Sequence, residues 1–301
     1  MDYNFPGFLN EILKEQYGEE IRDKILEGYK QKRYTTFRVN TLKSSIVEIE
    51  DILNNEKIEY EKVKWSEEAF IIKNVSEKEI EKLEIYQNGK IYLQSLSSML
   101  PPIILNPKEG MDILDMAAAP GGKTTQIAAL VNNKAAITAC EMNKIRAERL
   151  KYNIEKQGAN AYVMITDARN IDDFFSFNQI LLDAPCSGSG TLEAEDKNLQ
   201  KVFTKKLVDK SVKSQLALLK KALTILKPES EMVYSTCSIL SQENEEIINK
   251  VLNNLNCEIV PIELQGMEDL PLLPTKIKGT VCICPNKLYE GFFVAKIRKN
   301  I

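Results

Sequence analysis

The feature that most restricts the fold of this chain is a regular alternation of apolar runs and helical stretches from Asp112 onward. Short apolar runs typical of buried strands are followed by segments whose apolar residues recur at helical spacing. This order predicts a mostly parallel sheet with helices on both faces. The expected strands are residues 112–116, 136–140, 161–166, 179–182 and 232–234, and the expected helices are residues 123–130, 144–157, 213–226 and 242–255.

The end of the chain departs from this alternation. Residues 279–284 and 291–296 have strand-like patterns, and the turn-rich stretch between them predicts an antiparallel hairpin. A mostly parallel sheet that closes with such a hairpin is the outline of the Rossmann-like class I methyltransferases. We therefore predict an α/β fold of this class for residues 96–301.

Residues 1–95 have another pattern, in which charged helical stretches alternate with short strands. We expect them to form a small α+β domain that precedes the larger one. Its expected helices are residues 8–30 and 46–53, and its expected strands are residues 35–40, 60–63 and 69–72.

The composition excludes several kinds of catalytic chemistry but says little about the binding partner. Histidine is absent, which excludes a Ser-His-Asp triad and a histidine-ligated metal site. The six cysteines have no zinc-like CxxC spacing, so we expect reduced thiols in a cytoplasmic protein and no metal. A net charge of −3 does not by itself indicate a nucleic-acid partner, which would require basic residues gathered on one face.

A glycine-rich loop follows the first strand of the alternating region. In doubly wound sheets a ligand lies at the carboxyl ends of the strands beside such a turn, and the free N–H groups of the following helix can face a carboxylate. The loop lacks GxGxxG, so a nucleoside cofactor is favoured over a dinucleotide or a plain tight turn. The loop residues are Ala117, Ala118, Ala119, Pro120, Gly121, Gly122 and Lys123.

Two acidic residues end the next two expected strands. Glu141 lies about twenty residues after the loop, where a carboxylate can accept both ribose hydroxyls of a nucleoside. Asp167 ends the third strand, and we expect it to reach an adenine amine.

Two cysteines follow the fourth and fifth strands. Asp183-Ala-Pro-Cys186 and Ser-Thr-Cys237-Ser238 lie among small polar residues at loop openings. A buried cysteine is usually a small hydrophobe, and that interpretation suits Cys140 and Cys257, which lie in apolar strands. It does not suit Cys186 or Cys237.

A thiol at this edge is suited to methylation of carbon 5 of cytosine. That carbon is a weak nucleophile until a thiolate adds to carbon 6 and makes it enamine-like. We expect Asp183 to engage N3 and the amine of the ring. A helix after Cys237, capped by Ser241, is expected to favour the thiolate through its N-terminal dipole.

These motifs give the chain a resemblance to the Nop/Sun (RsmB/RsmF, Fmu-like) family of RNA cytosine-5 methyltransferases. The resemblance covers essentially the whole chain. It runs through Arg38-Val39-Asn40, Gln94 to Pro101, the glycine-rich loop, Glu141-Met142-Asn143 with Arg146, Asp167-Ala168-Arg169, both cysteine motifs, Glu243-Asn244-Glu245 and Gly291 to Lys296. Two departures stand outside the cysteine motifs. Asn286 stands where the family often has histidine after proline, and Glu229-Ser230 replaces a Gly-Gly turn.

The resemblance implies roles for particular residues. Cys237 is implied as the nucleophile and Cys186 as the thiol that assists product release. S-adenosylmethionine is implied as the methyl donor, and its pocket is implied to include the loop from Ala117 to Lys123 together with Glu141, Asp167, Asp183 and the nearby Arg146. The N-terminal domain is implied to bind RNA.

Several alternatives remain open at this point. Ribosomal RNA is favoured as the substrate of a monomeric enzyme, and transfer RNA is the nearest alternative. A methyltransferase for small molecules or proteins is disfavoured by the paired cysteines. An inactive RNA-binding protein is disfavoured by the intact Cys186, Cys237, Asp183 and Lys123.

Overall fold

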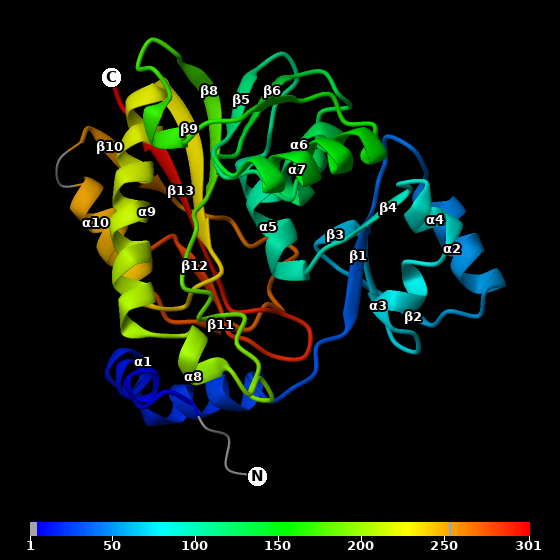
Figure 1. Cartoon of the computed structure of the whole chain (residues 1–301), viewed down its shortest axis with the longest axis horizontal. Helices are drawn as coiled ribbons and strands as arrows, with labels where there is room; N and C mark the ends of the chain where they lie inside the picture. Colours follow the sequence, from blue (N-terminus) through cyan, green and yellow to red (C-terminus); the bar gives the residue numbers. More distant parts are fainter. Residues whose placement is uncertain (1–4, 253–254) are drawn as a thin grey trace.

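The computed structural model describes residues 5–252 and 255–301, which form a large mixed sheet and a smaller antiparallel sheet (Figure 1). Within these residues, no helix has the length and apolar character needed to cross a membrane.

The large sheet confirms the predicted α/β fold. Its strand order is β11-β12-β13-β9-β8-β5-β6-β7, with β10 paired to β13. The neighbouring strands β7, β6, β5, β8 and β9 pair in parallel. β13 runs antiparallel to β9 and to β12, in agreement with the antiparallel hairpin predicted at the end of the chain. The strands are β5 (Asp112–Asp115), β6 (Ala136–Cys140), β7 (Tyr162–Met164), β8 (Phe177–Asp183), β9 (Leu226–Thr236), β10 (Cys257–Val260), β11 (Leu272–Leu273), β12 (Val281–Ile283) and β13 (Phe292–Lys299).

Helices cover both faces of this sheet, which explains why its strands are apolar at consecutive positions. Leu114 and Leu182 point into the core that contains α9 and α10, whereas Ile113 and Leu181 point into the opposite core with α5 and α6. The helices are α5 (Leu96–Leu105), α6 (Gly122–Leu130), α7 (Lys144–Gln157), α8 (Leu199–Val202), α9 (Lys205–Ile225) and α10 (Glu245–Leu252), with 3-10 turns η1 (Ala168–Asn170) and η2 (Ser241–Glu243).

The small sheet confirms the predicted α+β character of the N-terminal region. Its order is β2-β3-β1-β4, and its strand pairs are antiparallel. Phe37 and Phe70 stack at 5.2 Å between ring centroids in its own core with Ile49 and Leu53. The elements are β1 (Thr35–Val39), α2 (Ile46–Asn55), β2 (Tyr60–Val63), β3 (Ser66–Ile72), α3 (Glu77–Ile80), α4 (Glu84–Gln87) and β4 (Ile91–Leu93).

The first helix, α1 (Gly7–Gly28), packs away from the small sheet. Leu9, Leu13 and Ile25 are fully buried in the core of the large sheet, and Gly18 breaks the helix with a φ of 80°. A division of the chain at residue 95 stays a prediction, because the small sheet ends at Leu93 while α1 belongs to the other core.

Two elements had no clear sequence signal. β4 is three residues long, and α5 contains Pro101 and Pro102, which ordinarily indicate the end of a helix. Both elements lead directly into the site described next.

Candidate active site

The two cysteine motifs meet at one edge of the large sheet. β8 and β9 are parallel neighbours with Asp183 opposite Ser235, so the loops that follow them start side by side. The Sγ atoms of Cys186 and Cys237 are 3.0 Å apart, and both residues are half-buried. The arrangement brings together two thiols that the sequence predicted at separate strand ends.

A close approach between backbones holds the first loop against the terminal hairpin. The N–H group of Gly190 donates to the Cys237 carbonyl at 2.9 Å, and the N–H group of Gly291 donates to the Gly190 carbonyl at 2.8 Å. A Cβ atom at Gly190 would lie 1.9 Å from the Gly291 oxygen. Only glycine fits there, which accounts for the last residue of the Ser-Gly-Ser-Gly run.

An ion pair lies beside the thiols. The Nζ atom of Lys123, on α6, is 2.7 Å from Oδ2 of Asp183 and donates to the Ser98 hydroxyl of α5 at 2.8 Å. Burial alone would lower the pKa of Lys123, but the charge and hydrogen bond of Asp183 raise it above its usual value. The Ser235 hydroxyl donates to the other oxygen of Asp183 at 2.8 Å. The carboxylate is thus fixed at the end of β8 with a permanent cation next to it.

The glycine-rich loop from Ala117 to Gly121 forms the turn between β5 and α6. Asp115, which precedes it, is almost fully buried and accepts a hydrogen bond of 2.7 Å from Thr124. Burial raises the pKa of Asp115 to about 6. Its Oδ1 atom has no hydrogen-bond partner among the described residues.

Glu141 and Arg146 lie next to this turn, at the end of β6 and the start of α7. Glu141 is 4% exposed, and its carboxylate accepts from the Asn143 N–H group at 2.8 Å. Arg146 is 3.4 Å from Glu141 and donates to the carbonyl of Ala119 at 2.8 Å. Arg146 therefore ties the acidic residue to the glycine-rich turn.

Asp167 lies at the next strand end, after β7. Its carboxylate accepts hydrogen bonds from the backbone and the guanidinium of Arg169. The hydrogen bond from that side chain holds the pKa of Asp167 below its usual value. β5, β6 and β7 are neighbours in the sheet, so the three predicted cofactor segments share one edge.

One expectation about the second cysteine loop was wrong. The helix predicted from residue 242 begins at Glu245, and Ser241 starts the 3-10 turn η2 instead of capping a helix. Asn244 turns its side chain back to accept from Thr236 and to donate to the Ser238 carbonyl. These hydrogen bonds keep residues 238–244 compact, and the N-terminus of α10 therefore does not follow Cys237 directly.

Sequence reasoning did not identify α1 as part of the site. The Tyr17 hydroxyl donates to the Ile239 carbonyl at 2.6 Å, and the Tyr29 hydroxyl donates to the Ser189 carbonyl at 2.5 Å. The middle of α1 thus contacts the loop of Cys237, and Tyr29, which follows the end of α1, contacts the loop of Cys186. No short-range pattern in the sequence carries this information.

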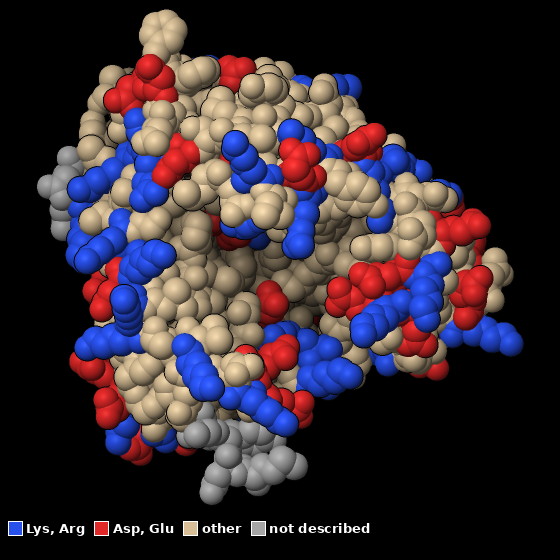
Figure 2. All heavy atoms as spheres, in the orientation of Figure 1, with Lys and Arg blue, Asp and Glu red and all other residues tan. Residues whose placement is uncertain are grey.

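A groove of about 1030 Å³ lies between the small sheet and the large domain. Figure 2 shows the surface hollowed between these two parts of the molecule. Its lining includes Ser95, whose hydroxyl donates to Glu290 at 2.7 Å and which lies one helical turn from Ser98. The basic residues of the lining are Lys30, Lys32, Arg33, Lys73, Lys78 and Lys287, interspersed with Glu77, Glu193, Glu195 and Glu290.

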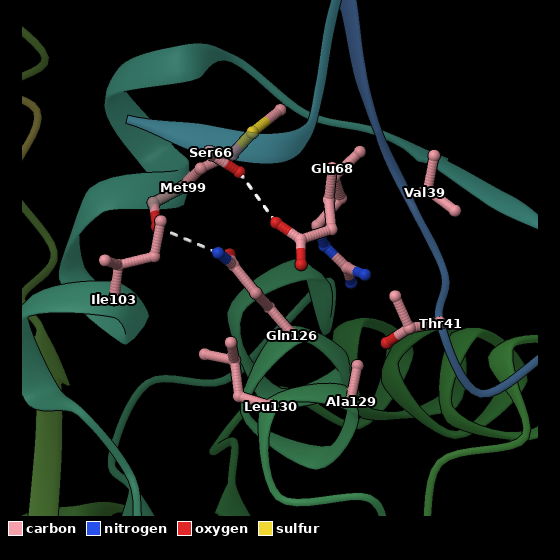
Figure 3. Close-up of a pocket in the computed structure, with 10 residues that line it drawn as sticks. Val39, Thr41, Ser66, Glu68, Met99, Ile103, Gln126, Ala129 and Leu130 are labelled. Atoms are coloured by element: carbon pink, nitrogen blue, oxygen red, sulfur yellow. Dashed lines mark hydrogen bonds between the residues drawn. The ribbon is translucent and has the colours of Figure 1, made fainter. Parts of the chain in front are cut away.

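A second cavity, of about 30 Å³, lies where the small sheet meets α5 and α6 (Figure 3). Glu68 accepts from Ser66 there, and Gln126 donates to the Met99 carbonyl. None of the sequence-predicted site residues lines this cavity, so it is a gap in the contact between the two parts of the chain.

Comparisons with known proteins match two separate segments of the chain. Residues 102–298 match the family described as 16S rRNA methyltransferase RsmB/F, and residues 5–77 match the ferredoxin-like domain of RsmF/B-like methyltransferases. The chain is 38% identical to the ribosomal RNA small subunit methyltransferase F of Vibrio atlanticus, with 88% of the chain aligned. It spans only 57% of the length of that relative.

Two archaeal relatives match the chain over nearly their full lengths. A tRNA (cytosine(49)-C(5))-methyltransferase of Pyrococcus abyssi is 33% identical, with 97% of this chain and 96% of the relative covered. The crystal structure of NSun6 from Pyrococcus horikoshii with SFG is 25% identical and has a TM-score of 0.86, with 98% of each chain covered.

Proposed function

The chain belongs to the 16S rRNA methyltransferase RsmB/F family, and on this basis we propose that it methylates carbon 5 of a cytosine in RNA. The observation that carries the proposal is the 3.0 Å separation of the Cys186 and Cys237 sulfurs beside the Lys123–Asp183 ion pair. Methylation of an amine or an oxygen needs no thiol, whereas methylation of carbon 5 needs a nucleophile that adds to carbon 6 and later leaves.

In this proposal Cys237 is the nucleophile. Its thiolate forms a bond to carbon 6, and the electron pair of the ring double bond becomes available at carbon 5. The ion pair of Lys123 with Asp183 lies beside the two thiols and holds an ammonium group at the site of attack. The Asp183 carboxylate accepts a hydrogen bond from the ring amine. N3 takes up a proton from solvent during the attack and returns it to solvent after the ring double bond has re-formed.

Cys186 serves the release step. Its pKa is raised by the hydrogen bond with Cys237, by burial and by the nearby charges of Cys237 and Glu243. Once the sulfur of Cys237 is bonded to carbon, its charge no longer acts on Cys186, which then gives its proton to solvent more readily. The Cys186 thiolate takes the proton from carbon 5, the ring double bond re-forms, and the electron pair of the C–S bond returns to Cys237.

S-adenosylmethionine, when bound, supplies an electrophilic methyl group. The residues at the strand ends fit this molecule, because carboxylates at the ends of β6 and β7 lie on the same sheet edge as the glycine-rich turn. The structure of the Pyrococcus horikoshii relative was solved with SFG, an analogue of S-adenosylmethionine. Glu141 would hold the ribose hydroxyls and Asp167 the adenine amine. Ala117, Ala118, Ala119, Pro120, Gly121 and Gly122 would surround the methionine end, where α6 offers free N–H groups and Asp115 has an unpartnered oxygen.

We propose ribosomal RNA of the small subunit as the substrate, in the cytoplasm. The family description and the Vibrio atlanticus relative support this choice. Transfer RNA is the second candidate, since the Pyrococcus abyssi relative acts on cytosine 49 of tRNA and matches the chain over 97% of its length. The groove with its six basic side chains supports an RNA partner in either case, because phosphate contacts supply much of RNA affinity.

The test is methyl transfer from radiolabelled S-adenosylmethionine by the purified protein. Naked small-subunit RNA, assembled small subunits and total tRNA are offered separately, and bisulfite sequencing locates the product. The proposal expects label at carbon 5 of one cytosine in the ribosomal substrates and none with Cys237→Ala. Label in protein or on another atom of the base, or equal activity of wild type and Cys237→Ala, contradicts it.

A further inference from the structure

A buried carboxylate, Glu243 in η2, lies between the two cysteine loops. Its side chain is fully buried, with 0% exposure. Its hydrogen bonds come from neutral donors, so its charge is not cancelled by an ion pair at the contact. A fully buried carboxylate is costly, and the arrangement around it therefore calls for an explanation.

Glu243 joins the residue after one cysteine to the residue after the other. The Ser187 N–H group donates to Oε1 at 2.7 Å, and the Ser187 hydroxyl donates to Oε2 at 2.5 Å. The Ser238 hydroxyl donates to the same Oε2 atom at 2.6 Å. One carboxylate thus sets the separation of the chain segments that carry Cys186 and Cys237.

The surrounding elements hold the carboxylate itself in place. Gln215, fully buried on α9, donates to Oε1 of Glu243 at 3.1 Å and to the Pro185 carbonyl at 3.1 Å. The Tyr234 hydroxyl donates to the Glu243 carbonyl at 2.6 Å. Since both side chain and backbone are fixed, Glu243 has little freedom to follow a loop that moves.

Glu243 also acts on one thiol of the pair through its charge. The hydrogen bond with Cys237 and burial raise the pKa of Cys186, and the charge of Glu243 raises it further. A negative charge beside a thiol disfavours its ionisation. Glu243 therefore favours the protonated form of Cys186.

We propose that Glu243 is a positioning residue that sets the spacing of the two cysteines and keeps the proton on Cys186 while Cys237 attacks. The inference rests on the function proposed above, and it gives a reason why two adjacent thiols do not exchange roles. The proton on Cys186 is donated toward the Cys237 sulfur. No bond forms or breaks at Glu243.

Two substitutions separate the effect of the side-chain length of Glu243 from the effect of its charge. Glu243→Gln keeps the length of the side chain and removes the charge, and Glu243→Asp keeps the charge but is one methylene too short to contact both loops. Glu246→Gln is the matched control, since Glu246 lies on the same segment and accepts a hydrogen bond from the Ser241 hydroxyl at 3.1 Å.

The measurement is the initial rate of alkylation of each cysteine by iodoacetamide as a function of pH, read by peptide mass spectrometry without RNA or cofactor. In the wild type, Cys186 reacts only above the pH at which an ordinary thiol ionises. Glu243→Gln shifts the Cys186 profile down by about one pH unit, or about tenfold in rate at neutral pH. Glu243→Asp leaves that profile in place and lowers RNA methylation at least about tenfold. Glu246→Gln changes neither.

An unchanged Cys186 profile in a folded Glu243→Gln variant overturns the proposal. Reaction of Cys186 at the pH of an ordinary thiol in the wild type overturns it as well, and this second measurement needs no variant to fold. Because alkylation requires no RNA, a lowered Cys186 profile in Glu243→Gln, in a protein that methylates no RNA, would contradict the proposed function and still support the effect of Glu243 on the Cys186 proton.

Discussion

Arg38 of the small sheet donates a hydrogen bond of 2.7 Å to Thr125 of α6, the helix that follows the glycine-rich loop. The same guanidinium donates to the Gly122 carbonyl at 3.1 Å and to the Gln94 side chain at 2.9 Å. It is 3% exposed, and burial lowers its pKa to about 10. The N-terminal sheet is therefore connected to the cofactor loop through one buried cation.

Arg38→Met is expected to destabilise the protein by about 3 kcal/mol, because buried acceptors on Gly122 and Gln94 lose their donor. Arg38→Lys is expected to recover little of this, since an ammonium group does not reproduce the planar fork. Chemical denaturation measures the loss, and calorimetric titration with S-adenosylhomocysteine measures an accompanying drop in affinity. Arg298→Met, at a half-exposed ion pair on β13, serves as control and should change the stability much less. Equal effects of the two substitutions would contradict this account.

Lys123→Met removes the partner of Asp183 and the cation nearest to the nucleophile. The carboxylate is left partly buried without its ion pair, so we expect a lower midpoint of thermal unfolding and a fall in turnover of at least about a hundredfold. Lys134→Met breaks the exposed Lys134–Glu109 pair and should change neither quantity appreciably. If the Lys123→Met protein had the turnover of the wild type, the ion pair would have no role in catalysis.

Cys186→Ala and Cys237→Ala should fail at different stages. Without Cys186 the adduct forms but is released slowly, so a covalent protein–RNA band accumulates on a denaturing gel. Without Cys237 no adduct forms, although binding of S-adenosylhomocysteine is retained. The double variant provides the background. Accumulation of the adduct in Cys237→Ala would reverse the two roles.

Asp115→Asn should change the pH dependence of stability. The folded-state pKa of about 6 lies above the ordinary 3.8, so the folded protein binds this proton more tightly than the unfolded chain does. The resulting destabilisation is absent well below pH 3.8, grows as the pH rises toward 6, and stays constant above it. The stability of the variant relative to wild type should therefore be about 2 kcal/mol greater at about pH 8 than at about pH 4.5. Urea denaturation at both pH values measures this difference, and a relative stability that does not vary with pH would contradict the buried ionisation.

The sequence predicted those residues of the site that lie at the ends of strands. The carboxyl ends of parallel strands meet at one edge, so Asp183, Cys186 and Cys237 were expected there before any coordinates. The bounds of β6 and α7 agree with the sequence pattern residue for residue, because both have clear periodicity and α7 has Asn143 and Gly158 as caps. The helix expected from residue 242 begins only at Glu245, because the side-chain hydrogen bonds of Asn244 hold the preceding residues in a different conformation, although their apolar residues have helical spacing.

The amino-acid sequence by itself determined the α/β order, the glycine-rich turn and the two thiols at neighbouring strand ends, since these depend on local periodicity and on motifs of a few residues. Only the tertiary structure decided that α1 contacts both cysteine loops, that Arg38 reaches α6 and that Glu243 joins Ser187 to Ser238. These contacts connect residues 5 to 222 positions apart, and they depend on how side chains fill the space between elements, a property that no short-range pattern encodes.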